Sequence, residues 1–147
     1  MVPLNLPPFD HKLKKAEGKF WIFDVLRKRY MVLTPEEWVR QHFVHYLLTE
    51  LKYPRTLIKV EGGLSYNQLQ KRSDIVVFDR EGKPWMLIEC KSPDETVGDN
   101  TLRQASVYNK TLGAHYLVVT NGLKHLCYRI HWTENRTEAL SVLPEYE

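Results

Sequence analysis

Apolar residues recur with a helical period in two parts of the chain. Thr34, Pro35 and Glu37 match an N-cap, the first helical position and the third residue of a capping box. They predict a helix that carries an apolar stripe and ends before Pro54. A second helix is expected over residues 100–112, which precede a glycine stop.

Short apolar or β-branched segments predict strands at 19–23, 30–33, 56–61, 75–78, 86–88, 115–120 and 123–130. The segments 75–78 and 86–88 are apolar on both faces, as in a sheet that helices cover on both sides. The order of these elements therefore predicts the α/β class, with an α/β/α sandwich around a central mixed β-sheet. We expect one domain over residues 1–147, with an extended arm at 1–18 and a polar tail at 133–147.

Three charged residues interrupt the two strands that are apolar on both faces. Asp74 begins the first, and Glu89 and Lys91 lie at the end of the second. If the turn has an even number of residues centred on 81–82, Asp74 lies opposite Glu89, with Cβ atoms roughly 4.5–5.5 Å apart. Lys91 then shares their face, whereas a slip of one residue separates the two acids. The same face is expected to carry the wall residues Val76, Phe78, Trp85 and Leu87.

Metal-assisted chemistry on a phosphodiester explains why such charges are kept in apolar strands. Buried charge is unfavourable unless it is paired or bound to a metal, and two close carboxylates repel unless a cation lies between them. Asp74, Glu89 and the main-chain carbonyl of Cys90 offer the oxygen ligands that suit Mg²⁺ or Mn²⁺. Lys91 would orient the attacking water or stabilise charge on phosphorus. The alternative is a surface hairpin with an acid–lysine pair across its strands.

The pattern Asp74…Glu89-Cys90-Lys91 resembles the PD-(D/E)xK nuclease signature, with Ser73 where the signature has proline. Gln104 and Tyr108 match a Gln-x-x-x-Tyr element of some branches, and their spacing places them on one helix face. Longer stretches resemble the N-terminal nuclease domain of type I restriction enzyme R subunits, and the resemblance covers roughly 20–129. These stretches are 33–41, 71–78, 87–93 and 119–122.

The resemblance implies a restriction-endonuclease-like fold and a metal-dependent deoxyribonuclease. The chain would be a DNA endonuclease or a nuclease module of a restriction or defence system, with Gln104 and Tyr108 helping to hold the DNA strand. A glutamate near the start of the first helix often completes such a site. We prefer Glu36 for this role, because Glu37 also fits the capping box. The alternative for Glu36 is a solvent-exposed pair with Arg40.

The formal net charge of +3 and the pI near 8.8 permit DNA binding without requiring it. Lys71, Arg72 and Arg103 flank the predicted site and are expected to contact phosphates. Two further basic clusters, at 12–15 and 27–29, have a simpler interpretation as solvated surface.

The remaining features favour a cytoplasmic protein without a membrane segment. No apolar run approaches the roughly 18 residues of a membrane span, and no leader pattern is visible. The two cysteines have neither metal-binding nor disulfide spacing. His42 and His45 lie one turn apart on the first helix, where packing is favoured over a metal-ligand pair.

The expected partners follow from the chemistry that the sequence lacks. It contains no Gly-x-x-x-x-Gly-Lys-Ser/Thr loop, so DNA translocation would require separate motor or methylase subunits. A double-strand break requires two strand cuts, which makes a homodimer an expected assembly. The alternative function is a catalytically silent DNA-binding or assembly module of the same fold.

Overall fold

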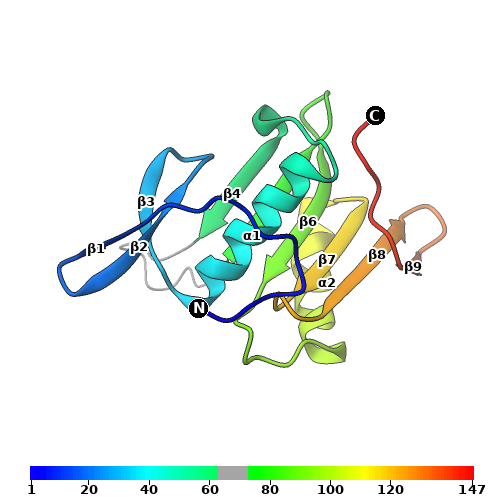
Figure 1. Cartoon of the computed structure of the whole chain (residues 1–147). Helices are drawn as coiled ribbons and strands as arrows, with labels where there is room; N and C mark the ends of the chain where they lie inside the picture. Colours follow the sequence, from blue (N-terminus) through cyan, green and yellow to red (C-terminus); the bar gives the residue numbers. More distant parts are fainter. Residues whose placement is uncertain (63–72) are drawn as a thin grey trace.

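The computed structural model describes residues 1–62 and 73–147 (Figure 1). Within them it contains the helices α1 (Pro35–Thr49) and α2 (Asp99–Leu112) and a short 3-10 turn at Arg55–Leu57. The strands are β1 (Leu13–Ala16), β2 (Lys19–Asp24), β3 (Arg29–Val32), β4 (Ile58–Gly62), β5 (Ser73–Phe78), β6 (Pro84–Cys90), β7 (Tyr116–Thr120), β8 (His125–His131) and β9 (Arg136–Leu140). The predicted helices and strands are confirmed, with shifts of a few residues at their ends.

The described strands form two sheets. One has the order β1-β2-β3 and is antiparallel throughout. The other has the order β4-β5-β6-β7-β8-β9. Its β6–β7 pair is parallel and the remaining described pairs are antiparallel, so the sheet is mixed as predicted. The parallel pair needs a long connection, and α2 supplies it.

The two helices cover opposite faces of the larger sheet. Residues of α1 pack in one core cluster with alternate residues of β5 and β6: Val39, Phe43, Leu47, Ile75, Val77, Met86 and Ile88. Ala105 of α2 packs in the second cluster with the intervening residues Val76, Leu87, Leu117 and Val119. Two faces of one sheet are therefore buried under two helices, which confirms the α/β/α sandwich.

Both helices begin with a side-chain hydrogen bond, and the one at α1 is the Thr34 cap that the sequence predicts. The hydroxyl of Thr34 accepts a hydrogen bond from the backbone N–H of Glu37 at 3.0 Å. The side chain of Glu37, however, is buried against the helix's own second turn and not folded back as a capping box. The hydroxyl of Thr101 accepts from the backbone N–H of Gly98 at 2.8 Å, and α2 stops at Gly113 in the left-handed conformation, with φ of 82°.

The structure corrects the predicted arm and tail. Residues 13–16 of the arm form β1, which pairs with β2, and residues 136–140 of the tail form β9, which pairs with β8. Both strands are short and largely exposed, so polar residues occupy them and no apolar alternation reveals them. The start of the arm runs along the domain, where the backbone N–H of Asn5 donates to the carbonyl of Gly122 at 2.8 Å.

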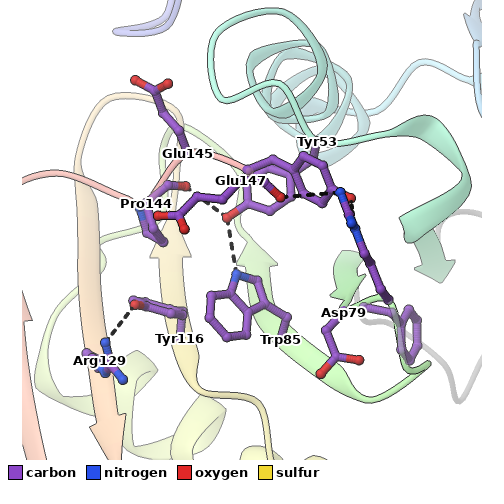
Figure 2. Close-up of a pocket in the computed structure, with 11 residues that line it drawn as sticks. Tyr53, Asp79, Trp85, Tyr116, Arg129, Pro144, Glu145 and Glu147 are labelled. Carbon is purple, nitrogen blue, oxygen red and sulfur yellow. Dashed lines mark hydrogen bonds between the residues drawn. The ribbon is translucent and has the colours of Figure 1, made fainter.

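Trp85 does not line the face that carries the three charges, contrary to the prediction. Phe78 pairs with Pro84 while Val77 pairs with Met86, so Trp85 is an additional residue in a β-bulge. Its ring packs with the α1-side core cluster, and its indole N–H donates to the hydroxyl of Tyr53 at 3.1 Å (Figure 2). The turn prediction missed this bulge because one additional residue leaves no trace in the hydrophobic pattern.

Burial of histidine on α1 predicts that acid weakens the fold. His42 and His45 pack against Phe9, and the Nδ1–H of His42 donates to the carbonyl of Trp38 at 2.8 Å. Burial lowers the pKa of both histidines below the ordinary 6.5, and neighbouring His11 lowers that of His42 further. The unfolded chain therefore binds protons first, and stability falls as pH drops through 6.5 towards the folded-state pKa values.

We expect the wild type to unfold at a lower urea concentration at pH 5.5 than at pH 7.5. The decrease in this midpoint should be smaller in His42→Gln/His45→Gln. The measurement is equilibrium denaturation followed by circular dichroism at both pH values. An equal fall in the two proteins would show that other groups cause the acid sensitivity.

Candidate active site

The two acids meet across the β5–β6 pair as predicted. Asp74 is the direct pairing partner of Glu89, and the two residues are 1% and 4% exposed. Their strand positions place them on the sheet face that carries Val76 and Leu87, beneath α2. Two carboxylates are thus held side by side at one end of the sheet and largely removed from water.

Lys91 joins the same site. Its Nζ lies 3.2 Å from Oε2 of Glu89, and about a quarter of its side chain remains exposed. Its backbone N–H donates to the carbonyl of Thr120 on β7 at 2.7 Å. The lysine is therefore anchored at its backbone, while its ammonium group lies between a buried acid and solvent.

Cys90 points away from the two acids. Its side chain is 2% exposed and packs in the α1-side core cluster. Burial raises the pKa of the Cys90 thiol, which keeps it protonated at neutral pH. A protonated thiol is a poor metal ligand, so the contribution of Cys90 to a metal site would come from its main-chain carbonyl.

Glu37 is the α1 acid that the structure connects to the strands, whereas the sequence led us to prefer Glu36. The carboxylate of Glu37 is buried and accepts hydrogen bonds from Arg40 and from Nε2 of Gln41, the latter at 2.7 Å. Arg40 in turn donates to the carbonyl of Glu61, the β4 residue that pairs with Asp74, at 2.6 Å.

Glu36 occupies a partly exposed position on the first turn of α1. The exposed Glu36–Arg40 pair considered from the sequence is not what the structure shows, because Arg40 is fully buried and pairs with Glu37. The sequence favoured Glu36 because the capping-box pattern gave Glu37 a separate role. In the structure the backbone N–H of Glu37 donates to the capping hydroxyl, and its carboxylate is buried in the interior.

The helix α2, which carries the predicted DNA-contacting residues Arg103, Gln104 and Tyr108, lies on the same side of the sheet as the acids. The helix α2 runs back alongside the sheet after β6 ends, so its first turns lie nearer to the site than its last. Arg103 and Gln104 are exposed on those turns, and Tyr108 packs at the edge of the core. Lys71 and Arg72 lie outside the described residues.

Asn121 organises the loop that follows Lys91, a role that sequence reasoning did not assign. Its side-chain N–H donates to the carbonyl of Glu95 at 2.8 Å. Its side-chain oxygen accepts from the backbone N–H groups of Leu123 and Lys124 at 2.9 and 2.8 Å. One buried amide thus ties the 92–98 loop to the turn after β7. The Asn-Gly turn signal at 121–122 was the available clue.

The oxygen set at this site fits a hard divalent cation. Among the side chains that the structure describes, no three His, Cys, Asp or Glu residues converge on one point. Asp74 and Glu89 would therefore supply two carboxylates, and main-chain, water and phosphate oxygens would supply the rest. Mg²⁺ characteristically keeps several waters and binds through one or two carboxylates.

A cavity of about 370 Å³, whose lining residues Figure 2 shows, lies at the end of β5 and β6 that is opposite to Asp74 and Glu89. Its walls include the aromatic rings of Tyr53, Trp85 and Tyr116, and the guanidinium of Arg129 donates to the hydroxyl of Tyr116 at 3.0 Å. The acids opposed across β5 and β6 do not line it, so this cavity is separate from the candidate site.

Together the sandwich and the site define a restriction-endonuclease-like protein: a mixed sheet between two helices, with paired acids and a lysine at one end of the central strands. The sequence pattern of the type I restriction enzyme R protein N terminus matches residues 35–144. The chain belongs to this family, which places it in the context of restriction systems. A search of curated proteins returned no match.

Within the described part of the chain, no helix is both long and apolar enough to span a membrane.

The buried pair on α1 predicts a sharp contrast between neighbouring glutamates. Glu37→Gln leaves the charge of Arg40 buried without a counter-charge, which should lower the free energy of unfolding by about 3–5 kcal/mol. Glu36→Gln makes the same chemical change at a partly exposed position and should have little effect. Urea denaturation of both variants is the measurement. Equal effects would contradict the importance of the buried pair.

Loss of the Asn121 amide should loosen the loop after Lys91. Asn121→Ala removes its hydrogen bonds to Glu95, Leu123 and Lys124, and should lower the free energy of unfolding by about 1–3 kcal/mol. Asn100→Ala, at an exposed position on α2, is the matched control. Hydrogen exchange at residues 92–98 should rise only in the first variant. Unchanged exchange there would show that the loop is held by other contacts.

Proposed function

We propose that the chain is a Mg²⁺- or Mn²⁺-dependent DNA endonuclease, or a nuclease module of a restriction or defence system, that hydrolyses phosphodiester bonds. The observation that carries this proposal is the direct pairing of Asp74 with Glu89, both buried, beside the Nζ of Lys91. Buried acids in direct opposition are unfavourable for folding alone, which argues for a functional reason to keep them.

Asp74, Glu89 and the main-chain carbonyl of Cys90 would hold the metal ion. When bound, such an ion polarises the phosphate and lowers the pKa of a coordinated water. The strands keep the two carboxylates at a fixed spacing, because their backbones pair directly and their side chains have little room to move. The site is thereby preorganised before DNA arrives.

Lys91 would act on the water and on the reacting phosphate. Its ammonium group is held near Glu89 yet remains partly open to solvent, so it reaches the side from which a DNA strand approaches. There it would orient the attacking water and offset negative charge that builds up on the phosphorus oxygens. Glu37, held by Arg40 and Gln41, would support the same end of the sheet from α1.

The surrounding polar residues would hold the strand. Gln104, Tyr108 and Arg103 on α2, together with Lys71 and Arg72, would bind the DNA backbone near the acids. The family belongs to enzymes with several subunits, so we propose that separate motor or methylase subunits supply translocation and target choice. DNA cleavage by this chain, with or without those partners, is the activity to be tested.

Removal of the Lys91 ammonium should slow cleavage strongly without disturbing the fold. Lys91→Ala is expected to cut supercoiled plasmid more slowly by a factor on the order of 10² in Mg²⁺ or Mn²⁺, a typical loss for one charge-stabilising group. Lys83→Ala changes an equally charged, exposed residue at the far end of β6 and should cut like the wild type. Equal cleavage by all three proteins would contradict the assigned role.

Metal binding can be measured without any DNA. Glu89→Gln should weaken Mn²⁺ binding in calorimetry by on the order of tenfold or more, since it removes a ligand charge. Glu81→Gln, in the exposed β5–β6 turn, should bind Mn²⁺ like the wild type. DNA binding by the wild type with neither Mn²⁺ binding nor cleavage would instead support a catalytically silent module.

A further inference from the structure

The β1–β3 sheet gathers the lysines and aromatic residues of the N-terminal region on one face. Lys14 pairs with Trp21, and Phe23 pairs with Tyr30. The backbone N–H of Phe23 donates to the carbonyl of Lys12, so Lys12 lies opposite Phe23 at the next position of the β1–β2 pairing. Strand alternation therefore places these five residues on a common side, here called the lysine–aromatic face.

The opposite side of the same sheet faces the protein. Ile22 and Met31, which pair with each other, are 0% and 6% exposed. The lysines of the lysine–aromatic face are exposed, and its rings are half-buried. The face is therefore the outward side of the sheet, and Figure 1 shows the sheet extending away from the sandwich beside α1 and β4.

Lysine and ring alternate closely on this face. The Nζ of Lys14 lies 4.3 Å from the ring centre of Tyr30, and the Nζ of Lys12 lies 5.6 Å from that of Phe23. The rings of Phe23 and Tyr30 are 5.3 Å apart, edge to face. In water the lysine stems shield the rings. A phosphate that attracts the ammonium groups would uncover the ring faces.

The positive charge of the chain is concentrated in this sheet. Between positions 12 and 29 there are seven basic residues and two acids, Glu17 and Asp24, giving a formal charge of +5. The whole chain carries +3, so all other residues together carry −2. Asp24 and Arg27 form an ion pair at 2.8 Å, and the +5 already counts both charges. The net negative charge of the other residues would repel DNA slightly, whereas the positive charge of the β1–β3 sheet would attract it.

The sheet is also placed to extend the candidate site. After β3 ends at Val32, two residues lead directly into α1, whose first turn carries Glu37. Both the strands 13–16 and 19–24 precede the residues that match the family, 35–144. The lysine–aromatic face thus lies just before the residues that match the family model, and it is joined to the start of α1.

We propose that the lysine–aromatic face binds an unpaired DNA strand, with Lys12 and Lys14 on phosphates and Phe23 and Tyr30 stacking on bases. This inference rests on the proposed action of the chain on DNA. Phosphate contacts alone would need only the lysines, whereas ring faces recognise bases that lack stacked neighbours. Interleaved cations and rings are the combination that single-strand binding surfaces use. The strand would run from this face past the first turn of α1 towards the acids.

The first test measures affinity for fluorescein-labelled oligo(dT) by anisotropy in EDTA, where no cleavage occurs. Lys12→Gln/Lys14→Gln should bind about 20-fold more weakly at ~0.1 M salt, and the slope of log affinity against log salt should fall by about 1.4. Lys83→Gln/Lys110→Gln makes the same charge change at exposed positions elsewhere and should bind like the wild type. Equal affinities for the two double variants would overturn the proposal.

The second test separates stacking from charge. Tyr30→Leu should weaken oligo(dT) binding about fivefold or more, in line with the loss of one stacked base, and leave binding to a duplex of equal length unchanged. Thermal melting by circular dichroism checks that the variant is folded. Parallel losses on both DNAs, or tighter wild-type binding to duplex than to single strand, would overturn the proposal.

The third test needs no variant. In the amide NMR spectrum of the wild type, oligo(dT) should shift the signals of residues 12–32. Shifts confined to other residues would overturn the assigned face, even if Lys91→Ala abolishes cleavage and the nuclease function stands. Shifts at 12–32 in a protein that cuts no DNA would support the face and leave the nuclease proposal refuted.

Discussion

The pairing of β5 with β6 is the constraint on which the remaining architecture depends. One alignment directs Ile75, Val77, Met86 and Ile88 towards α1 and brings Asp74 opposite Glu89 on the other face. A shift of one residue between the two strands would place one acid beneath α1 and leave the other on the opposite face, which would separate them. The hydrophobic core thus enforces the position of the charges. Apolar packing against α1 on one face of the sheet holds the two repelling carboxylates together on the other face.

The buried network of Glu37, Arg40 and Gln41 extends this constraint to the helix. It lies between α1 and the strands, and Arg40 reaches the backbone of β4 at Glu61, the pairing partner of Asp74. Polar groups without solvent need fixed partners, so the network allows α1 few positions relative to the sheet. Together with the Asn121 amide, it surrounds the acidic end of the sheet with hydrogen bonds of defined geometry.

Charge is divided in space between two parts of the molecule. The acidic end of the sandwich suits a divalent cation, and the β1–β3 sheet suits a polyanion. A strand attracted by the sheet would be brought to acids that on their own would repel it. This arrangement gives a physical reason why a domain with paired buried carboxylates carries a basic sheet on the same side as its first helix.

Much of the fold follows from local pattern. Apolar strands, the Thr34 cap and the glycine stop after α2 determined the layers, because these signals depend on neighbours in sequence. The pairing of Asp74 with Glu89 was also predicted, but from an even turn, whereas the structure has an odd turn between Phe78 and Pro84 and the bulge at Trp85 restores the alignment. The bulge at Trp85 and the inward turn of Glu37 were decided by tertiary packing against distant segments, which leaves no periodic signal in the residues that make the contacts. The strands β1 and β9 pair with their neighbours in sequence, but they are exposed and largely polar, so no apolar alternation marks them.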